Sequence, residues 1–197
     1  MTFTAAELDA FRDREVADLV DLAHTRPRLV FVGINPGLWT AATGSHFAHP
    51  TNRFYPALHA AGLTSRPFDR VHGLPETDRR ELTDKGIAIT NLVSRATTRA
   101  SELSAQELRD GGVSLVARMT QWRPTVVAVA GVTAYRTAFA RSRATMGEQG
   151  DAMTPGTAWW VVPNPSGLNA HETIASLAAW YRQVAVAAGV ELLSQGR

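Results

Sequence analysis

Asparagine-rich turns follow the apolar segments of this chain, and their side-chain amides are the groups best placed to do chemistry. The apolar run at 29–32 leads into Gly-Ile-Asn-Pro-Gly at 33–37, and the run at 159–162 leads into Pro-Asn-Pro-Ser-Gly-Leu-Asn at 163–169. An asparagine beside a proline at the end of a buried strand has a defined orientation, and its amide both donates and accepts hydrogen bonds. It can therefore position a water molecule or read the edge of a base. A single segment of this kind is more typical of a plain turn, but two at one edge of a sheet favour a site.

Four continuous apolar runs predict the strands that position these turns. Continuous rather than alternating apolarity is typical of strands covered on both faces. The runs are 29–32, 87–89, 126–130 and 159–162, and the helices predicted around them are 4–24, 52–61, 76–84, 104–122, 132–141 and 173–188. Strands alternating with helices predict an α/β fold, a three-layer αβα sandwich with a central, mostly parallel four-stranded sheet. We expect a single domain over residues 1–197.

The carboxyl edge of such a sheet is where ligands bind. This edge should bring Asn35, Asn91 and Asn164 together, although Asn91 is equally typical of a turn residue. The stretch 37–86 after the first strand is long and loop-rich, which is typical of a functional insertion.

Three segments together resemble a known family. They are GINPG at 33–37, GSHFAHPTNRFYPALHAAGLT at 44–64 and NPSGLN at 164–169. They resemble the mismatch-specific uracil-DNA glycosylase family, the G:U/G:T mismatch branch of the uracil-DNA glycosylase superfamily. The resemblance covers about 28–187 and leaves the predicted N-terminal helix at about 4–24 outside the family core.

The resemblance implies a uracil-DNA glycosylase-like fold and a monofunctional DNA glycosylase. Such an enzyme flips uracil, chiefly from G:U mismatches, out of duplex DNA and hydrolyses its N-glycosidic bond, leaving an abasic site for base-excision repair. Its partner is double-stranded DNA that contains a G:U mismatch, with G:T and modified-cytosine mismatches as further substrates to test.

The base pocket implied by this resemblance is assigned residue by residue. Asn35 resembles the catalytic asparagine that orients the attacking water. The main chain of Gly33 and Ile34 would line the pocket, and Phe47 matches the aromatic residue that stacks on the extruded base. Asn164 resembles the asparagine that faces the base and sugar.

Two further residues extend that pocket. Thr40 follows Trp39 where the family usually has small residues. It would meet the 5-methyl group of thymine, so we hypothesise that it disfavours thymine. Asn91, at the end of the second strand, would offer another amide to the base.

The NPSGLN segment is assigned to DNA binding. Ser166 matches a phosphate-contacting serine, and Gly167 and Leu168 resemble the wedge that enters the duplex; Asn169 completes this segment. Arg95 and Arg99 are further phosphate-contact hypotheses, with a solvated surface as the alternative.

The residue inventory limits the chemistry. The chain has no cysteine, which excludes thiolate metal sites and cysteine nucleophiles. His46 and His49 lie in a loop with no acidic cluster, so we expect no metal, and the reaction needs no cofactor. An amide cannot take a proton from water at neutral pH, so Asn35 would give a slow enzyme. Lys85, the only lysine, precedes the second strand and is poorly placed for a Schiff base.

Charge and hydropathy are consistent with a DNA-binding protein without being diagnostic of one. The 20 basic residues exceed the 18 acidic ones by a net charge of +2, and all but one of the basic residues are arginine. Charged residues throughout the first 20 positions argue against a signal peptide, and no apolar run reaches membrane-spanning length. We expect a cytoplasmic protein with no membrane contact, and a monomer.

Other functions remain open from sequence alone. A non-catalytic module that binds mismatches or abasic sites would use the same residues apart from Asn35. An esterase with Ser166 as nucleophile and His171 as base lacks the Gly-x-Ser-x-Gly elbow. A nucleoside hydrolase or a nucleotide-binding protein would also fit the fold class.

Overall fold

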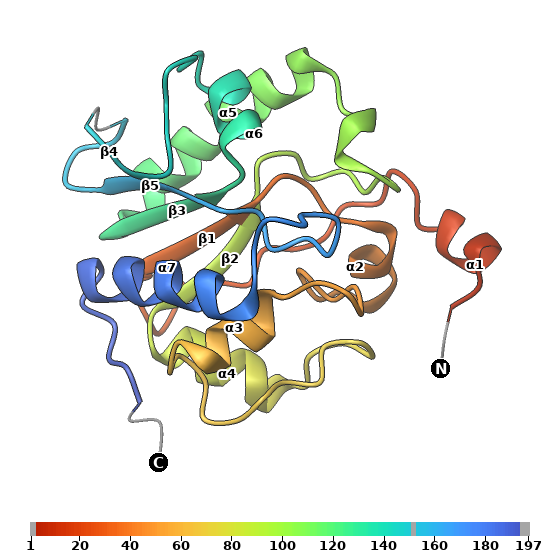
Figure 1. Ribbon diagram of the computed structural model, residues 1–197, viewed down its shortest axis with the longest axis horizontal. Helices are drawn as coiled ribbons and strands as arrows, with labels where there is room; N and C mark the ends of the chain where they lie inside the picture. Colours follow the sequence, from red (N-terminus) through yellow and green to blue (C-terminus); the bar gives the residue numbers. More distant parts are fainter. Residues whose placement is uncertain (1–2, 151–152, 194–197) are drawn as a thin grey trace.

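A central sheet organises the molecule in the computed structural model, which describes residues 3–150 and 153–193 (Figure 1). Within these ranges the sheet has five strands in the order β2-β1-β3-β5-β4. The predicted α/β fold with a mostly parallel sheet is confirmed, but the sheet has five strands rather than four. The parallel strands are β1 (Leu29–Gly33), β2 (Ile87–Asn91), β3 (Val126–Ala130) and β5 (Ala158–Val162), and β4 (Gly147–Gln149) is antiparallel to β5.

Helices cover both faces of the sheet (Figure 1). Leu29 and Phe31 of β1 belong to one buried cluster, whereas Val30 and Val32 belong to the other. This division explains the continuous apolar runs, because both sides of each strand need apolar residues. The first cluster packs against α3 (Phe54–Ala60), α4 (Glu76–Asp84) and α7 (Ile174–Ala187), and the second against α5 (Ala105–Trp122) and α6 (Val132–Ala138).

The predicted helices after the first strand are present, with small differences at their ends. Helix α5 begins with a capping box between Ser104 and Glu107, in agreement with the predicted start at 104. Helix α6 ends at Ala138 rather than near 141. Two short helices, α2 (Leu38–Thr43) and the 3₁₀ helix η1 (Ala100–Glu102), were not predicted. None of the helices in residues 3–150 and 153–193 has the length and apolarity to cross a membrane.

The N-terminal helix predicted over 4–24 is wrong beyond its first turns. Helix α1 (Ala5–Asp9) begins with a capping box between Thr4 and Glu7, but residues 10–13 form turns, and isolated β-bridges at Glu15 and Leu19 follow. Leu19 and Ile89 exchange two backbone hydrogen bonds of 2.9 Å, so the segment pairs with the outer edge of β2. Pairing with an otherwise open strand edge outweighs the helical pattern of the sequence. Residues 10–19 are called the N-terminal segment below.

Candidate active site

A cleft of about 290 Å³ lies at the carboxyl ends of β1, β2 and β5. Figure 1 shows the loops that follow these strands gathered at one edge of the sheet, beside α2. No aspartate, glutamate, lysine or arginine occurs among the described residues that line the cleft. Eight of the predicted site residues line it, namely Ile34, Asn35, Thr40, Phe47, Asn91, Asn164, Ser166 and Leu168. The predicted residues Gly33, Gly167 and Asn169 are not part of its lining.

Asn35 is held by its amide nitrogen in the loop after β1. Nδ2 donates to the carbonyl oxygen of Pro36 at 3.2 Å, to that of Arg95 at 3.1 Å and to Oγ1 of Thr97 at 2.7 Å. The Thr97 hydroxyl in turn donates to the carbonyl of Arg99 at 2.9 Å, which leaves its oxygen free to accept from Asn35. No group in the described part of the chain donates to Oδ1 of Asn35. This oxygen is therefore available as an acceptor in the cleft.

The rigidity of this loop comes from pairing beyond the ends of the strands. The β1–β2 ladder continues where Leu92 N donates to Gly33 O at 2.9 Å and Val93 N donates to Ile34 O at 3.0 Å. Farther along, Thr97 N donates to Pro36 O at 3.1 Å. The acceptors that hold Asn35 are thus fixed by backbone pairing rather than by a mobile turn.

Asn91 ends β2, and its side chain contacts a buried histidine. Its Nδ2 lies 3.0 Å from Nδ1 of His46, and Nε2 of His46 lies 3.0 Å from the carbonyl oxygen of Ala17. Burial is the largest cause of the lowered pKa of His46, which is 3% exposed. Arg118 donates to the main-chain carbonyl of Asn91 at 2.7 Å. Both the side chain and the main chain of Asn91 are therefore anchored.

Phe47 forms an apolar wall of the cleft. Its ring stacks on Phe54 with centroids 4.2 Å apart and an interplanar angle of 25°. Its backbone is left-handed, with φ at +56°, a conformation that non-glycine residues adopt rarely and often at functional sites. A Cβ on Gly33 would lie 2.4 Å from Oδ1 of Asn91 and 3.2 Å from Cζ of Phe47. Glycine at position 33 thus lets the backbone approach both side chains.

Helix α2 contributes Thr40, which is 5% exposed and lines the cleft. The neighbouring Trp39 is fixed by a 2.9 Å hydrogen bond from Nε1 to the carbonyl of Val71 and by an edge contact with His49. His49 itself is exposed and lines the cleft. Burial, and then the charge of Arg70, lowers the pKa of His49.

The loop after β5 is closed by its own polar side chains. Oδ1 of Asn164 accepts from the backbone N–H of Ser166 at 3.0 Å, which leaves Nδ2 without a partner among the described residues. Oγ of Ser166 accepts from the N–H of Leu168 at 3.3 Å, and Nδ2 of Asn169 donates to the carbonyl of Asn164 at 3.0 Å. Leu168 is 89% exposed at the rim of the cleft.

Arg53 connects this loop to the start of α3. Its Nη2 donates to the carbonyls of Ser166 and Asn169, both at 2.6 Å, and its Nη1 donates to the carbonyl of Glu172. A Cβ on Gly167 would come within 2.4 Å of Oγ1 of Thr51, so the loop packs closely on the segment before α3. The exposed Leu168 is therefore carried by a well-anchored loop.

Several lining residues were not predicted from the sequence. They are Pro36, Gly37, His49, Thr51, Asn52, Thr97, Thr98 and Ala100. The pair Thr97-Thr98 follows β2 by a few residues, so it lies at the carboxyl edge of the sheet. This position in the sequence could have identified both threonines as candidate site residues. Arg53 lies inside the segment 44–64 that carried the family resemblance, but nothing in its local sequence reveals its three carbonyl partners.

Other residues considered from the sequence have different surroundings. Arg95 forms ion pairs with Asp13 at 2.8 Å and Glu107 at 2.7 Å, which compete with the phosphate contact considered for it. Arg95 is also the largest cause that lowers the pKa of Glu107 to about 2. Lys85 donates to the carbonyl of Leu63 before β2, at the opposite edge of the sheet from the cleft. In the described part of the chain no hydrogen bond joins Ser166 and His171, as an esterase pair would require.

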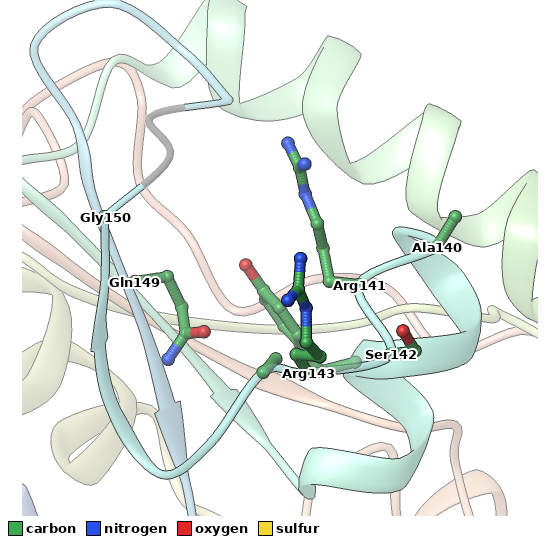
Figure 2. A pocket seen from close by; sticks show the side chains of 8 residues that line it. Ala140, Arg141, Ser142, Arg143, Gln149 and Gly150 are labelled. Atoms are coloured by element: carbon green, nitrogen blue, oxygen red, sulfur yellow. The ribbon is translucent and has the colours of Figure 1, made fainter.

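A second pocket of about 320 Å³ lies beside α6 and the edge strand β4 and shares no residue with the cleft. Figure 2 shows the side chains of Arg141 and Arg143 extending in the same direction from the loop after α6, across from Gln149. None of the residues predicted for the site lines this pocket. Within residues 3–150 and 153–193, no group of three or more histidine, aspartate or glutamate side chains could hold a metal ion.

The fold and cleft define an α/β protein with a cleft lined by asparagine amides and an aromatic wall at the carboxyl edge of a mostly parallel sheet. The sequence profile of the Uracil DNA glycosylase superfamily matches residues 20–187, and the chain belongs to this superfamily. The match begins slightly before the start expected at about 28 and ends at the expected position. It includes the whole cleft and excludes the N-terminal segment.

A solved structure supports the fold assignment. The solution NMR structure of a proposed uracil DNA glycosylase from Methanosarcina acetivorans is similar, with a TM-score of 0.56 and 15% sequence identity. The similarity covers 87% of this chain and 98% of that chain. The two proteins therefore share one architecture over nearly the whole length of the relative.

Proposed function

We propose that the protein is a monofunctional DNA glycosylase that excises uracil, chiefly from G:U mismatches in duplex DNA, and leaves an abasic site for base-excision repair. The observation that carries this proposal is an uncharged cleft in which Asn35 keeps Oδ1 free beside the stacked ring of Phe47. Superfamily membership supplies the class of reaction.

Base binding begins with extrusion of the target nucleotide from the helix. The ring of Phe47, supported from behind by Phe54, offers a flat apolar surface on which a pyrimidine can stack. Asn91 offers an amide oxygen to the polar edge of the base. A cleft of about 290 Å³ is at the lower end of the range of ligand pockets, which suits one base with its sugar.

Hydrolysis breaks the bond between C1′ of the sugar and N1 of uracil. The electron pair of this bond stays on N1, so uracil leaves as an anion, and the oxygen of a water molecule bonds to C1′. Oδ1 of Asn35 accepts a hydrogen bond from that water and orients it, while the proton of the water passes to solvent. Since an amide cannot act as a general base, catalysis rests on positioning and on stabilisation of charge. The cleft contains no amine among its described residues, so the proposal includes no Schiff base and no strand cleavage.

Duplex binding is assigned to the loop after β5. An exposed leucine on an anchored loop can enter the base stack when a nucleotide leaves it, as apolar wedges do in other DNA-binding proteins. We assign this role to Leu168 and a phosphate contact to Ser166. Gly167 and Asn169 shape the loop that carries them.

Thymine differs from uracil by one methyl group, and we assign its rejection to Thr40. Thr40 is buried and lines the cleft, so extra volume next to it has little room. We expect slower excision from T:G than from U:G. Equal rates on the two duplexes would show that Thr40 does not discriminate.

The test uses excess protein and end-labelled duplexes that contain one U:G, T:G or U:A pair, followed by alkali. Wild type should give alkali-dependent cleavage at U:G, and Asn35→Ala should lose it. Gln106→Ala removes an exposed amide on α5, outside the cleft, and is the matched control that should keep full activity. Mismatch binding without cleavage by wild type would instead identify a recognition module, and cleavage by Asn35→Ala would remove Asn35 from the catalytic role.

A further inference from the structure

His46 connects the N-terminal segment to the base pocket. Its ring lies between the carbonyl oxygen of Ala17 and the amide nitrogen of Asn91, with both contacts at 3.0 Å. Ala17 lies before residue 20, where the match to the superfamily begins. The pocket therefore depends on a backbone group from outside the matched region.

The chemistry of these three groups fixes the direction of each hydrogen bond. A carbonyl oxygen can only accept, so Nε2 of His46 must carry a hydrogen to bond with Ala17. A neutral imidazole carries only one hydrogen on its two nitrogens, so Nδ1 must accept. Burial disfavours the charged form and lowers the pKa of His46, so the ring is neutral near pH 7. Asn91 must then turn Nδ2 towards His46, which directs Oδ1 towards Gly33 and the cleft.

We infer that the chain from Ala17 through His46 to Asn91 sets the hydrogen-bonding polarity of the base pocket, so that Asn91 presents an acceptor to a base that carries a ring N–H. This inference rests on the proposed function and specifies it further. Uracil has an N–H at N3 and fits this polarity, whereas neutral cytosine has a lone pair at N3. His46 is a positioning residue, because it acts on the base only through Asn91.

The charged groups around His46 belong to three elements. Asp18 comes from the N-terminal segment, Arg79 from α4 and Arg118 from α5; Asp18 favours protonation of the ring and the two arginines oppose it. Asp18 also pairs with Arg118 at 3.0 Å, and Arg118 holds the main chain of Asn91. Asp18 and Arg118 hold the end of β2 in place, while only His46 among the described residues hydrogen-bonds to the side-chain amide of Asn91.

Protonation of His46 would reverse the polarity of the pocket. A cationic imidazole carries hydrogens on both nitrogens, so Nδ1–H would face the N–H of Asn91. Relief of this conflict requires the amide to rotate, which turns Oδ1 to His46 and Nδ2 to the cleft. Excision should therefore fall as the pH drops through the pKa of His46, which lies below the usual 6.5.

The experiment measures single-turnover uracil excision from a U:G duplex as a function of pH, from about pH 5 to about pH 8. Wild type should lose about tenfold of its rate at the acidic end as the amide turns. Asn91→Ala should be slower at every pH but should lack this acidic decrease. A decrease of equal size in Asn91→Ala would overturn the inference. His49 lines the cleft and titrates as well, so His49→Gln must show the same relative decrease as wild type; its disappearance would assign the effect to His49.

A double-mutant cycle tests the same link at neutral pH. His46→Phe keeps a buried ring but removes both hydrogen bonds, and its loss of rate should not add to that of Asn91→Ala. Multiplicative losses would show that His46 acts independently of Asn91 and would overturn the inference. If His46→Phe does not fold, the pH profiles of wild type, Asn91→Ala and His49→Gln decide the question. Absence of excision by wild type at every pH would contradict the proposed function itself. Excision that shows no link between His46 and Asn91 would contradict only the further inference.

Discussion

Each of the three asparagines in the cleft has one end of its side-chain amide held by the protein, and this decides what the other end offers. Nδ2 is occupied in Asn35 and Asn91, so both present Oδ1. Oδ1 is occupied in Asn164, so this residue presents Nδ2. A complementary ligand therefore brings hydrogen-bond donors to the β1 and β2 side and an acceptor to the β5 side. A water molecule, the N–H of a base and an oxygen of a sugar would meet these requirements.

Thr97→Val tests the support of Asn35. The substitution keeps the shape of the side chain but removes the hydroxyl that accepts from Nδ2 of Asn35 at 2.7 Å. We expect the single-turnover excision rate to fall about fivefold, as loss of one hydrogen bond of about 1 kcal/mol predicts. Thr137→Val on α6 is the matched control, because its hydroxyl bonds only to the carbonyl of Thr133 within the helix. An unchanged rate in Thr97→Val would mean that the two backbone carbonyls suffice to hold Asn35.

Gly33→Ala tests the close approach of the β1 backbone to Asn91 and Phe47, two residues that line the cleft. The new Cβ would stand 2.4 Å from Oδ1 of Asn91, so Asn91 or the base must move. A displacement of about 1 Å in a catalytic site can lower a rate by about a hundredfold, and we expect a loss of this order. Affinity for an abasic duplex, which places no base in the cleft, should stay the same. Equal losses of excision and abasic-duplex affinity would indicate a general distortion of the DNA-binding surface instead.

The sequence predicted the residues that carry a motif and missed those that act through long-range contacts. Asn35, Phe47 and Leu168 line the cleft as predicted. The support from Thr97 and the contact of His46 with Asn91 were not predicted, because each depends on a hydrogen bond between segments far apart in the sequence. Pattern and propensity describe local structure, whereas such contacts exist only once the chain has folded.

The loop after β5 is the element whose position depends most on a single side chain. Its own turn hydrogen bonds are local, but its attachment to the rest of the molecule is concentrated in Arg53, which donates to three of its carbonyls. Carbonyl groups in a loop have few other partners, and a guanidinium group can bind several of them at once. The loop that presents Leu168 is thus fixed from the start of α3.

Arg53→Met should loosen this loop without changing the core. Methionine keeps the apolar part of the side chain and removes all three side-chain hydrogen bonds to the loop. We expect affinity for an abasic duplex to fall about tenfold, a loss of about 1.4 kcal/mol, with a smaller effect on the excision rate at saturating protein. Fluorescence anisotropy with labelled duplex measures the affinity.

Arg26→Met is the matched control for the lost charge. Arg26 also donates to a backbone carbonyl, that of Arg123, but it precedes β1 at the opposite edge of the sheet. It should therefore leave DNA affinity unchanged. Equal weakening in both variants would assign the effect to net charge instead of loop position.

Elements were predicted well where burial leaves a strong pattern. Strands β1, β2 and β3 are buried on both faces and β5 is mostly buried, and their continuous apolar runs identified them. Strand β4 has three partly exposed residues with no apolar run, so it had no detectable signal. The N-terminal segment has apolar residues at helical spacing, but its pairing with β2 is a tertiary interaction that local pattern cannot reveal.

At the scale of the whole molecule, both edges of the sheet are protected. The N-terminal segment pairs with β2 through Leu19, and the other edge is formed by β4, an antiparallel strand of only three residues that offers little backbone for pairing. Protected edges reduce the usual template for strand pairing between copies, which favours the monomer expected from the sequence. The same segment supplies the carbonyl of Ala17 to His46, so the protection of the sheet and the construction of the site use one piece of chain.

The buried tyrosines make the stability of the whole fold sensitive to alkaline pH. Tyr55 and Tyr181 are each 1% exposed and lie in the buried cluster that packs against α3, α4 and α7. Burial raises the pKa of both phenols. Their pKa in the unfolded chain is about 10. Above that pH the unfolded state loses protons that the folded state keeps. The contribution of these two phenols to the free energy of unfolding is therefore constant below about pH 10 and falls as the pH rises further.

Tyr55→Phe isolates one of these two contributions. Each buried tyrosine should steepen the alkaline decrease by about 1.4 kcal/mol per pH unit, so the variant should lose this amount from the slope. At neutral pH it should be at least as stable as wild type, because the Tyr55 hydroxyl is buried with no hydrogen-bond partner among the described residues. Urea unfolding followed by tryptophan fluorescence at a series of pH values measures both quantities, and Tyr181→Phe should show the same change of slope. The chain contains no cysteine and one lysine, so few other side chains lose a proton in this range. A slope that neither substitution reduces would show that the alkaline limit of the fold is set outside this tyrosine pair.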